Sequence, residues 1–169
     1  MAFKELDIKE FSLKPFYAFD EGWALVSAGE AESFNTMTVS WGGLGTLWSE
    51  SVATVYIRPQ RYTREFFERE SRFSISLFEG GFHKELAYLG SHSGRDEDKL
   101  AKTPAITPAF EYGVPLFPVA TYNLVCEKLY TGDLHGENFN DLALRDKVYP
   151  ESDYHRVFIG RVIRLLESE

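Results

Sequence analysis

The sequence predicts a mainly β fold, in which a closed or nearly closed barrel carries a few short helices. Several segments alternate apolar and polar residues with the period of a strand and are rich in Val, Ile, Thr, Tyr and Phe. Only two short segments have a helical pattern, and no strand–helix–strand rhythm recurs along the chain. With 169 residues and neither an internal repeat nor a flexible linker, we expect one domain over residues 1–169.

Five segments are predicted to be strands. Residues 35–41 alternate Met37, Val39 and Trp41 with threonine and serine, so the apolar side chains point to one face and the hydroxyls to the other. The other predicted strands are residues 52–57, 73–78, 119–130 and 155–166.

Two segments are predicted to be helices. Thr63 is a good N-cap for residues 63–69, where glutamates follow early enough to favour the helix dipole. Residues 83–90 carry spaced leucines and end at a glycine. Four prolines between residues 102 and 118 predict that this segment has no regular structure.

The charge distribution excludes one class of partner and indicates another. A formal net charge of −8 argues against nucleic-acid binding, which needs a basic face for the phosphates. Residues 58–72 depart from that acidity, with five arginines against three glutamates. This basic island is a candidate site for a small anion.

Composition also bears on location. No apolar run is long enough to cross a bilayer, and the chain shows no export leader. The single cysteine, Cys126, cannot form an internal disulfide, and its place in a predicted strand suggests a small buried apolar side chain. We therefore expect a cytoplasmic protein without a membrane partner.

Residues 35–48 are the first candidate for ligand contact. The hydroxyl face of the strand can meet a polar ligand edge, and Gly42, Gly43 and Gly45 would let a flat ring or a phosphate approach the backbone. The alternative is a half-exposed strand followed by a glycine turn.

Two further segments are candidates for an anion site. Arg58 and Arg61 precede a predicted helix start, where backbone N–H groups are free and Thr63 would cap the helix or share its hydroxyl with the anion. Residues 91–99 form a small polar loop that ends at Lys99 and can close over a phosphate. Solvated surface arginines and an ordinary surface turn are the alternatives. The spacing of the histidines predicts no metal site, and neither a dinucleotide-binding nor a phosphate-binding glycine loop occurs.

Four segments follow one another in a recognisable order: Asn35-Thr-Met-Thr-Val-Ser-Trp, Leu44-Gly-Thr-Leu-Trp, Arg58-Pro-Gln-Arg-Tyr-Thr and Leu89-Gly-Ser-His-Ser-Gly-Arg-Asp-Glu-Asp-Lys. In this order they resemble the flavin reductase-like FMN-binding family, in particular its flavoredoxin branch. The resemblance is detailed from residue 35 to residue 99 and looser towards the C-terminus. It implies a split β-barrel that forms a homodimer and binds FMN near the subunit interface.

The resemblance also implies roles for individual residues. The flavin would be lined by Asn35, Thr36, Met37 and Thr38, with Trp41 packed near the ring. The phosphate end would be surrounded by Arg58, Arg61, Tyr62 and Thr63. The remaining ribityl and phosphate contacts would come from Ser91, Ser93, Gly94 and Lys99.

The late segment Asp153-Tyr-His-Arg-Val-Phe-Ile-Gly-Arg-Val resembles a family strand whose histidine is associated with the nicotinamide in the reductases. The resemblance gives His155 that role, although Asp153 stands where the family has glycine and adds bulk and negative charge. That change favours a flavoredoxin. In the alternative interpretation, His155 only orders the turn at residues 149–154.

The predicted function is therefore that of an FMN-dependent oxidoreductase. Two variants remain open: an NAD(P)H-dependent flavin reductase, and a flavoredoxin that passes electrons between protein partners. The alternative from another class is a non-catalytic FMN-binding module, such as a flavin store or sensor.

Overall fold

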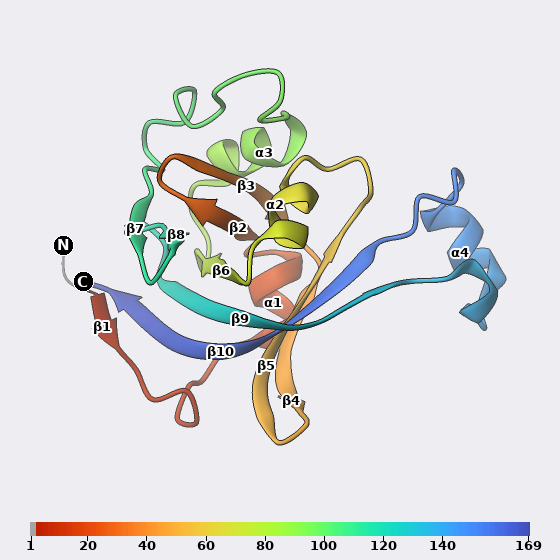
Figure 1. Cartoon of the computed structure of the whole chain (residues 1–169), viewed down its shortest axis with the longest axis horizontal. Coiled ribbons are helices and arrows are strands. Elements are labelled where there is room, and N and C mark those ends of the chain that lie inside the picture. The colour runs from red at the N-terminus through yellow and green to blue at the C-terminus, as the bar shows by residue number, and fades with distance from the viewer. Residues whose placement is uncertain (1–2) are drawn as a thin grey trace.

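The computed structural model describes residues 3–169, and antiparallel strands make up most of it (Figure 1). Its elements are β1 (Phe3–Glu5), α1 (Pro15–Asp20), β2 (Ala24–Glu30), β3 (Ser33–Val39), β4 (Gly42–Leu47), β5 (Glu50–Ile57), α2 (Thr63–Arg69), β6 (Arg72–Leu77), α3 (His83–Ser91), β7 (Ala109–Glu111), β8 (Val114–Leu116), β9 (Tyr122–Asp133), the 3₁₀ turn η1 (Gly136–Asn138), α4 (Leu142–Val148) and β10 (Arg156–Ser168). The predicted fold class, a mainly β split barrel with a few short helices, is confirmed.

One large sheet forms the barrel. Its strand order is β3–β2–β6–β9–β10–β5–β4, and β1 also pairs with β10. Strand β10 pairs with β9 along one edge, while its other edge pairs with β5 over residues 156–161 and with β1 over residues 166–168. Within residues 3–169, no strand pairs with that second edge between β5 and β1.

The barrel core is apolar and follows the predicted alternation. Met37 and Val39 of β3 are buried in the main core cluster, as expected from their period-two spacing. Cys126 on β9 is free and fully buried, so the prediction of a small apolar side chain is confirmed. Gly160 on β10 leaves room for the Phe73 ring, since a Cβ on Gly160 would lie 2.6 Å from that ring.

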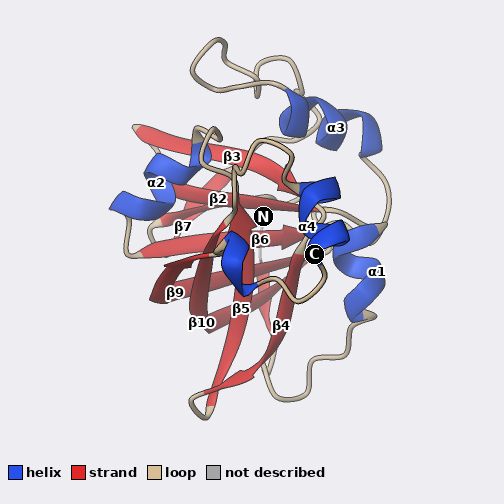
Figure 2. Cartoon of the chain, turned by 90° about the vertical axis from the view of Figure 1, so that its right-hand side faces the viewer, coloured by secondary structure: helices blue, strands red, loops and turns tan. Residues whose placement is uncertain are grey.

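Helices α2 and α3 both lie beside β3 (Figure 2). They position the loop before α2 and the loop after α3. Helix α3 packs against β3, and the Thr38 hydroxyl donates a hydrogen bond to the carbonyl oxygen of Leu86 in α3 over 2.5 Å. A Cβ on Gly90 would lie 3.2 Å from the Cβ of Thr38, so a larger residue here would have to push Thr38 back by a few tenths of an ångström. Helix α2 packs against β2 and β3.

The ends of β9 and β10 leave the barrel together and carry η1 and α4 between them (Figure 1). We call residues 129–156 the arm. None of the α4 residues is buried, and its apolar side chains Leu142 and Leu144 are 55% and 50% exposed. The arm is therefore a projection whose helix exposes Leu142 and Leu144 within the described chain.

The proline-rich segment was predicted wrongly. Strands β7 and β8 form a short hairpin there, with Phe110 opposite Pro115. Tyr112 and Gly113 both have positive φ, which suits a tight hairpin turn, and the carbonyl of Pro115 accepts a hydrogen bond from the Ser74 hydroxyl. Proline is tolerated because an isolated two-stranded ribbon leaves one edge of each strand unpaired. The sequence interpretation also missed β1, α1, β2, β4 and α4.

Candidate functional site

A cavity of about 160 Å³ lies where β3, the start of α2 and the end of α3 meet. Its walls are Asn35 and Met37 from β3, residues 60–63 before and in the first turn of α2, and residues 91–94 with Lys99 from the loop after α3. We call it the first cavity. It brings together three segments that the sequence analysis singled out separately.

Two cations face the first cavity and share one local role. Nη1 of Arg61 donates to the carbonyl oxygen of Gly90 over 2.6 Å. Nζ of Lys99 donates to the carbonyl oxygens of Leu89 and His92 over 3.0 and 3.3 Å. Both side chains thus satisfy backbone carbonyls that the end of α3 leaves without helical partners.

Neither cation forms an ion pair within the described chain, although Glu97 lies near enough to Lys99 to offset part of the lowering of its pKa. Among residues 3–169, no carboxylate lies within ion-pair distance of Arg61 or Lys99. Lys99 is only 4% exposed, and burial together with the nearby Arg61 charge lowers the pKa of Lys99 to about 8. Two adjacent, partly desolvated cations that share one cavity are suited to an anion.

The amide of Asn35 organises the opposite wall. Its Nδ2 donates to the Thr63 hydroxyl over 2.8 Å, and Thr63 is the first residue of α2 and makes no side-chain capping bond. The N-cap position is Tyr62, and the predicted Thr63 cap is therefore wrong. Gly94 packs directly on this amide, because a Cβ there would lie 2.3 Å from Oδ1 of Asn35.

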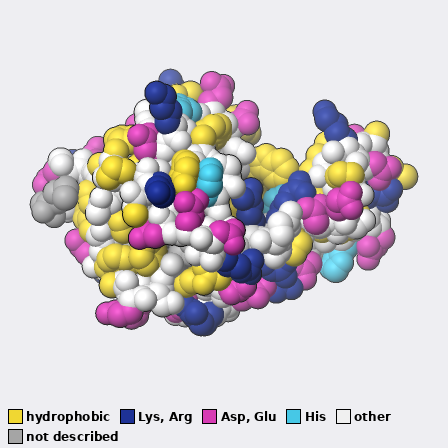
Figure 3. Space-filling view, turned by 90° about the horizontal axis from the view of Figure 1, so that it is seen from above, with side chains coloured by type: hydrophobic (Ala, Val, Ile, Leu, Met, Phe, Trp, Pro, Cys, Tyr) yellow, Lys and Arg dark blue, Asp and Glu magenta, His cyan; other side chains and the backbone are white. Residues whose placement is uncertain are grey.

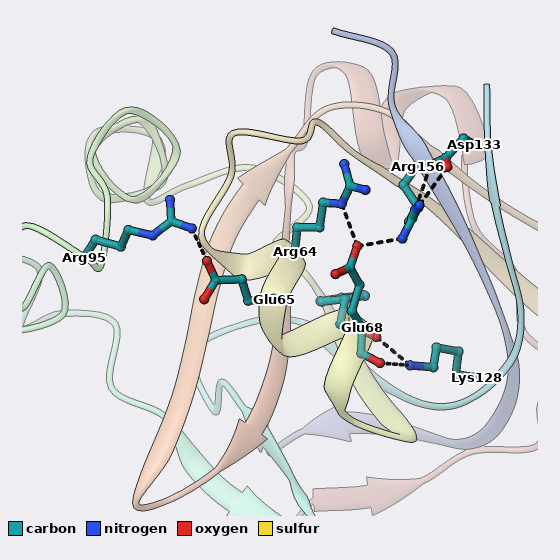
Figure 4. Close-up of polar contacts among 8 residues, drawn as sticks. Arg64, Glu65, Glu68, Arg95, Lys128, Asp133 and Arg156 are labelled. Carbon is teal, nitrogen blue, oxygen red and sulfur yellow. Dashed lines mark hydrogen bonds and ion pairs between the residues drawn. The ribbon is translucent and has the colours of Figure 1, made fainter. Parts of the chain in front are cut away.

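Ion pairs on α2 hold the helix and its first turn in place (Figure 4). Glu68 accepts hydrogen bonds from Arg64 and Arg156, each over 2.7 Å, and Arg156 also pairs with Asp133. At the end of the helix, Nζ of Lys128 donates to the carbonyl oxygens of Phe67 and Glu68. These contacts connect α2 to the base of the arm.

The predicted basic island is mostly neutralised within the protein. Arg58 pairs with Asp153, Arg64 with Glu68, and Arg69 with Glu70. Arg72 donates to the carbonyl oxygen of Tyr112. Of the five arginines, only Arg61 faces the first cavity, so the anion site is narrower than the sequence indicated.

A second cavity of about 230 Å³ adjoins the first along Met37 and Arg61. Its other walls include Thr38, Trp41, Arg58 and His155. Trp41 is 45% exposed and its ring centroid lies 5.0 Å from that of His155, so Trp41 is not a core residue. From above, basic side chains and a histidine are visible where the body meets the arm (Figure 3).

His155 is held as a neutral ring. Burial and the positive charge of Arg58 lower the pKa of His155 to about 4. Its Nδ1 lies 2.7 Å from the hydroxyl of Tyr149, and burial raises the pKa of Tyr149. This hydrogen bond fixes the orientation of the neutral imidazole, and either Nδ1 or the phenol can be its donor, depending on the tautomer.

Asp153 directs Arg58 towards the arm. The carboxylate pairs with Nη1 of Arg58 and accepts a hydrogen bond from Gln60 over 2.9 Å. Nη2 of Arg58 donates to the carbonyl oxygen of Val148, at the end of α4, over 2.9 Å. The negative charge of Asp153 is thus balanced by Arg58, and hydrogen bonds from Gln60 and Arg58 lower its pKa.

The structure distributes the predicted site residues between the two cavities. The first cavity contains Asn35, Met37, Arg61, Tyr62, Thr63, Ser91, Ser93, Gly94 and Lys99. The second contains Thr38, Trp41, Arg58 and His155, and it shares Met37 and Arg61 with the first. Arg58 therefore lies beside Trp41, outside the first cavity, which the resemblance did not anticipate.

Two of the predicted site hydroxyls make hydrogen bonds within the protein, and their contact with a ligand stays a prediction. Thr36 is buried and its hydroxyl accepts from the Ser27 hydroxyl over 2.8 Å. The Ser91 hydroxyl donates to the carbonyl oxygen of Ala87 in the preceding turn of α3. Both residues stabilise the walls through these bonds.

The glycine run does not lie at either cavity. A Cβ on Gly42 would lie 2.4 Å from the Phe19 ring, so this glycine accommodates α1. Gly43 and Gly45 have open space beside them in β4. At Gly42 the space is taken by Phe19, whereas the expectation that Gly43 and Gly45 admit a ring or a phosphate stays a prediction.

The sequence interpretation missed several lining or supporting residues. Gln60 and His92 line the first cavity, Tyr56 lines the second, and Tyr149 holds His155. Gln60 and His92 lie inside two of the four segments that resemble the family, so their position in the sequence was a usable signal. The contact between Tyr149 and His155 agrees with the alternative interpretation, in which His155 orders the turn at residues 149–154.

The structure was also compared with the requirements of metal sites and membrane spans. No group of three or more His, Cys, Asp or Glu side chains that could hold a metal is present in residues 3–169. None of the helices described is long and apolar enough to span a membrane.

Comparison with known proteins places this geometry in a family. The family model described as "Flavin reductase like domain" matches residues 16–169. The search of curated proteins found no match.

Solved structures share the fold. An FMN-binding protein from Thermus thermophilus, with bound 1-cyclohex-2-enone, is 26% identical, with a TM-score of 0.64 over 94% of this chain and 78% of that chain. The styrene monooxygenase flavin reductase from Pseudomonas putida S12 is 24% identical, with a TM-score of 0.63 over 88% and 80% of the two chains. A flavoredoxin from Methanosarcina acetivorans is 19% identical, with a TM-score of 0.65 over 98% and 76%. Because the family model spans most of the sequence, this chain belongs to the flavin reductase-like domain family.

Proposed function

We propose that the protein binds FMN across the two cavities and moves electrons through it, as a flavin reductase or a flavoredoxin does. The observation that carries this proposal is the pair Arg61 and Lys99, two cations without a carboxylate partner in the described chain, facing a cavity that continues towards Trp41 and His155. The two volumes, about 160 and 230 Å³, together suit a small ligand of mononucleotide size.

The chemistry of each cavity supports one orientation. The first cavity offers two cations and the hydroxyls of Thr63 and Ser93, which are suitable for a phosphate. The second is lined by Met37 and Trp41, which are suitable for a flat aromatic ring. We therefore place the phosphate end in the first cavity and the ring end in the second. Bound FMN would supply the redox chemistry, while the protein supplies binding, orientation and electrostatics.

The proposal is tested by titrating the purified protein with FMN and with riboflavin, following flavin fluorescence. FMN should bind with micromolar or better affinity and clearly more tightly than riboflavin, because each lost charge-assisted hydrogen bond costs about 1.5–3 kcal/mol. Folded protein that binds neither flavin, or binds both equally, would contradict the phosphate assignment.

His155 is proposed to receive the nicotinamide of NAD(P)H when the protein acts as a reductase. Its neutral ring lines the second cavity beside Trp41, and its Nδ1 hydrogen-bonds the Tyr149 hydroxyl. Replacing His155 with alanine should raise KM for the nicotinamide several-fold and leave FMN affinity unchanged, because the residue would contact substrate and not cofactor. Unchanged kinetics, or an equal loss of FMN, would assign His155 to ordering the 149–154 turn.

A non-catalytic FMN module remains the alternative function. Mixing the FMN-loaded protein with NADH or NADPH under anaerobic conditions distinguishes the variants. Bleaching of the flavin absorbance at catalytic rates identifies a reductase. A parallel experiment adds a reduced electron-transfer protein in place of the nicotinamide. Bleaching by that protein alone identifies a flavoredoxin, and no bleaching by the nicotinamides or by that protein supports a store or sensor.

We also propose a homodimer located in the cytoplasm. The arm exposes Leu142 and Leu144, and Arg58 connects its base to the second cavity. A second copy of the chain that covers the arm would therefore lie close to the ring end of the site. Light scattering should return twice the 19.3 kDa chain mass, and replacing both leucines with glutamate should shift the protein to the monomer. A wild-type monomer that still binds FMN would refute the dimer alone.

A further inference from the structure

A third cavity of about 480 Å³ adjoins the first cavity on the side away from Trp41. The two share four residues, Asn35, Tyr62, Gly94 and Lys99. Any group attached to a phosphate in the first cavity and directed away from the ring end would meet this space. Its volume alone would not exclude a nucleoside.

The charge of the third cavity is opposite to that of the first. Its walls carry four acidic residues, Glu32 and the run Asp96, Glu97 and Asp98. No carboxylate lines the first cavity. The two neighbouring cavities therefore differ in electrostatic character across one shared wall.

The one additional cation of the third cavity is already engaged. Nη2 of Arg95 pairs with Glu65, and its guanidinium carbon lies 4.8 Å from the Tyr62 ring centroid. Glu32 and Asp96 are exposed, and they have no ion pair or side-chain hydrogen bond among the residues that the structure describes. Their charges are therefore free to act on a ligand.

The shared wall is also tightly packed. Gly94 lies on the amide of Asn35, and a Cβ at Gly94 would be 3.4 Å from Cδ1 of Tyr62. The Asn35 amide is itself held by the Thr63 hydroxyl. A second phosphate would have to pass this wall to enter the third cavity.

We propose that the boundary between the first and third cavities makes the site selective for flavin mononucleotide over flavin adenine dinucleotide. This inference rests on the proposed FMN function. A terminal phosphate monoester carries almost two charges at pH 7, which Arg61 and Lys99 can balance. In the dinucleotide the same phosphate carries one charge, and the second phosphate carries its charge towards Glu32 and Asp96. Both differences favour the mononucleotide.

The test compares the dissociation constants of FMN, FAD and riboflavin for the wild type and for the double variant Glu32→Gln/Asp96→Asn. The matched control is Glu10→Gln/Asp20→Asn, which removes two exposed charges outside all three cavities. We expect the wild type to bind FMN at least tenfold more tightly than FAD. The double variant should tighten FAD binding several-fold and change FMN binding little, while the control variant keeps the wild-type ratio. Added salt should reduce the wild-type discrimination.

Three other outcomes would contradict different parts of the proposal. Equal wild-type affinities for FMN and FAD would overturn the selectivity while leaving the proposed FMN function intact. A wild-type preference that the double variant does not reduce would overturn the role of the acidic wall. Failure of FMN to bind at all would overturn the proposed function and this inference together.

Discussion

Raising the pH through the pKa of Lys99 should weaken FMN binding without affecting riboflavin. Lys99 is buried beside Arg61 and has a pKa of about 8 in the free protein. Only the protonated amine attracts a phosphate dianion, so binding the phosphate raises the pKa of Lys99 and takes up a proton. Affinity therefore falls as the pH rises through the pKa of the free protein.

The size of the effect follows from that pKa. With a pKa of about 8, Lys99 is about nine-tenths protonated at pH 7 and about one-tenth protonated at pH 9. If Lys99 stays protonated in the complex, the dissociation constant for FMN should be about tenfold larger at pH 9 than at pH 7. The phosphate itself does not change charge in this range, because its second pKa is about 6.

The assay is a set of fluorescence titrations at half-unit steps between pH 7 and pH 9, with FMN and with riboflavin. Lys99→Arg keeps the positive charge at every pH and should flatten the FMN profile. Lys99→Gln should also give a flat profile, but with weaker binding throughout. A similar slope for riboflavin, or a slope that persists in Lys99→Gln, would refute the assignment of the phosphate to Lys99.

The burial of Lys99 should have the opposite pH dependence for the stability of the ligand-free protein, which should increase with pH. The pKa of Lys99 is lowered on folding, so the unfolded chain binds more protons and stability rises with pH between about 8 and 10. From pH 7 to pH 9 the gain should be about 1 kcal/mol, measured by urea unfolding. Lys99→Gln should lose this gain. A decrease in wild-type stability over this range would contradict the buried cation.

Three further predictions address other parts of the structure. Gly94→Ala should weaken FMN binding roughly tenfold in fluorescence titrations while the protein stays folded by circular dichroism, because the new Cβ would displace the Asn35 amide. The wild type should lose on the order of 2 kcal/mol of stability as the pH falls from 6.5 to 4, because His155 is buried neutral while the unfolded chain takes up the proton, and His155→Gln should lose less. Gly160→Ala should lower stability by about 1–3 kcal/mol in thermal unfolding, because its Cβ would overlap the Phe73 ring, and an unchanged Tm would contradict this packing.

The sequence by itself determined the fold class and the segments of the site. Strand periodicity is a local property, so residues 35–41 could be identified as a strand whose Met37 and Val39 enter the core. The helix at residues 63–69 and the loop at 91–99 were also recognisable locally, and the order of four segments indicated the family that the comparison shows. These predictions succeeded because each depends on neighbours in the chain.

Only the tertiary structure decided which charges remain available to a ligand. The sequence gives no reason to distinguish Arg58 from Arg61. In the structure, Asp153, which lies 95 positions after Arg58, neutralises Arg58, whereas Arg61 faces the first cavity. Lys99 reaches the same cavity because the end of α3 brings its carbonyl groups there. An ion pair between distant residues depends on how the barrel closes. The pattern of side chains along the chain therefore predicted where an anion site would form, and the fold determined which cations form it.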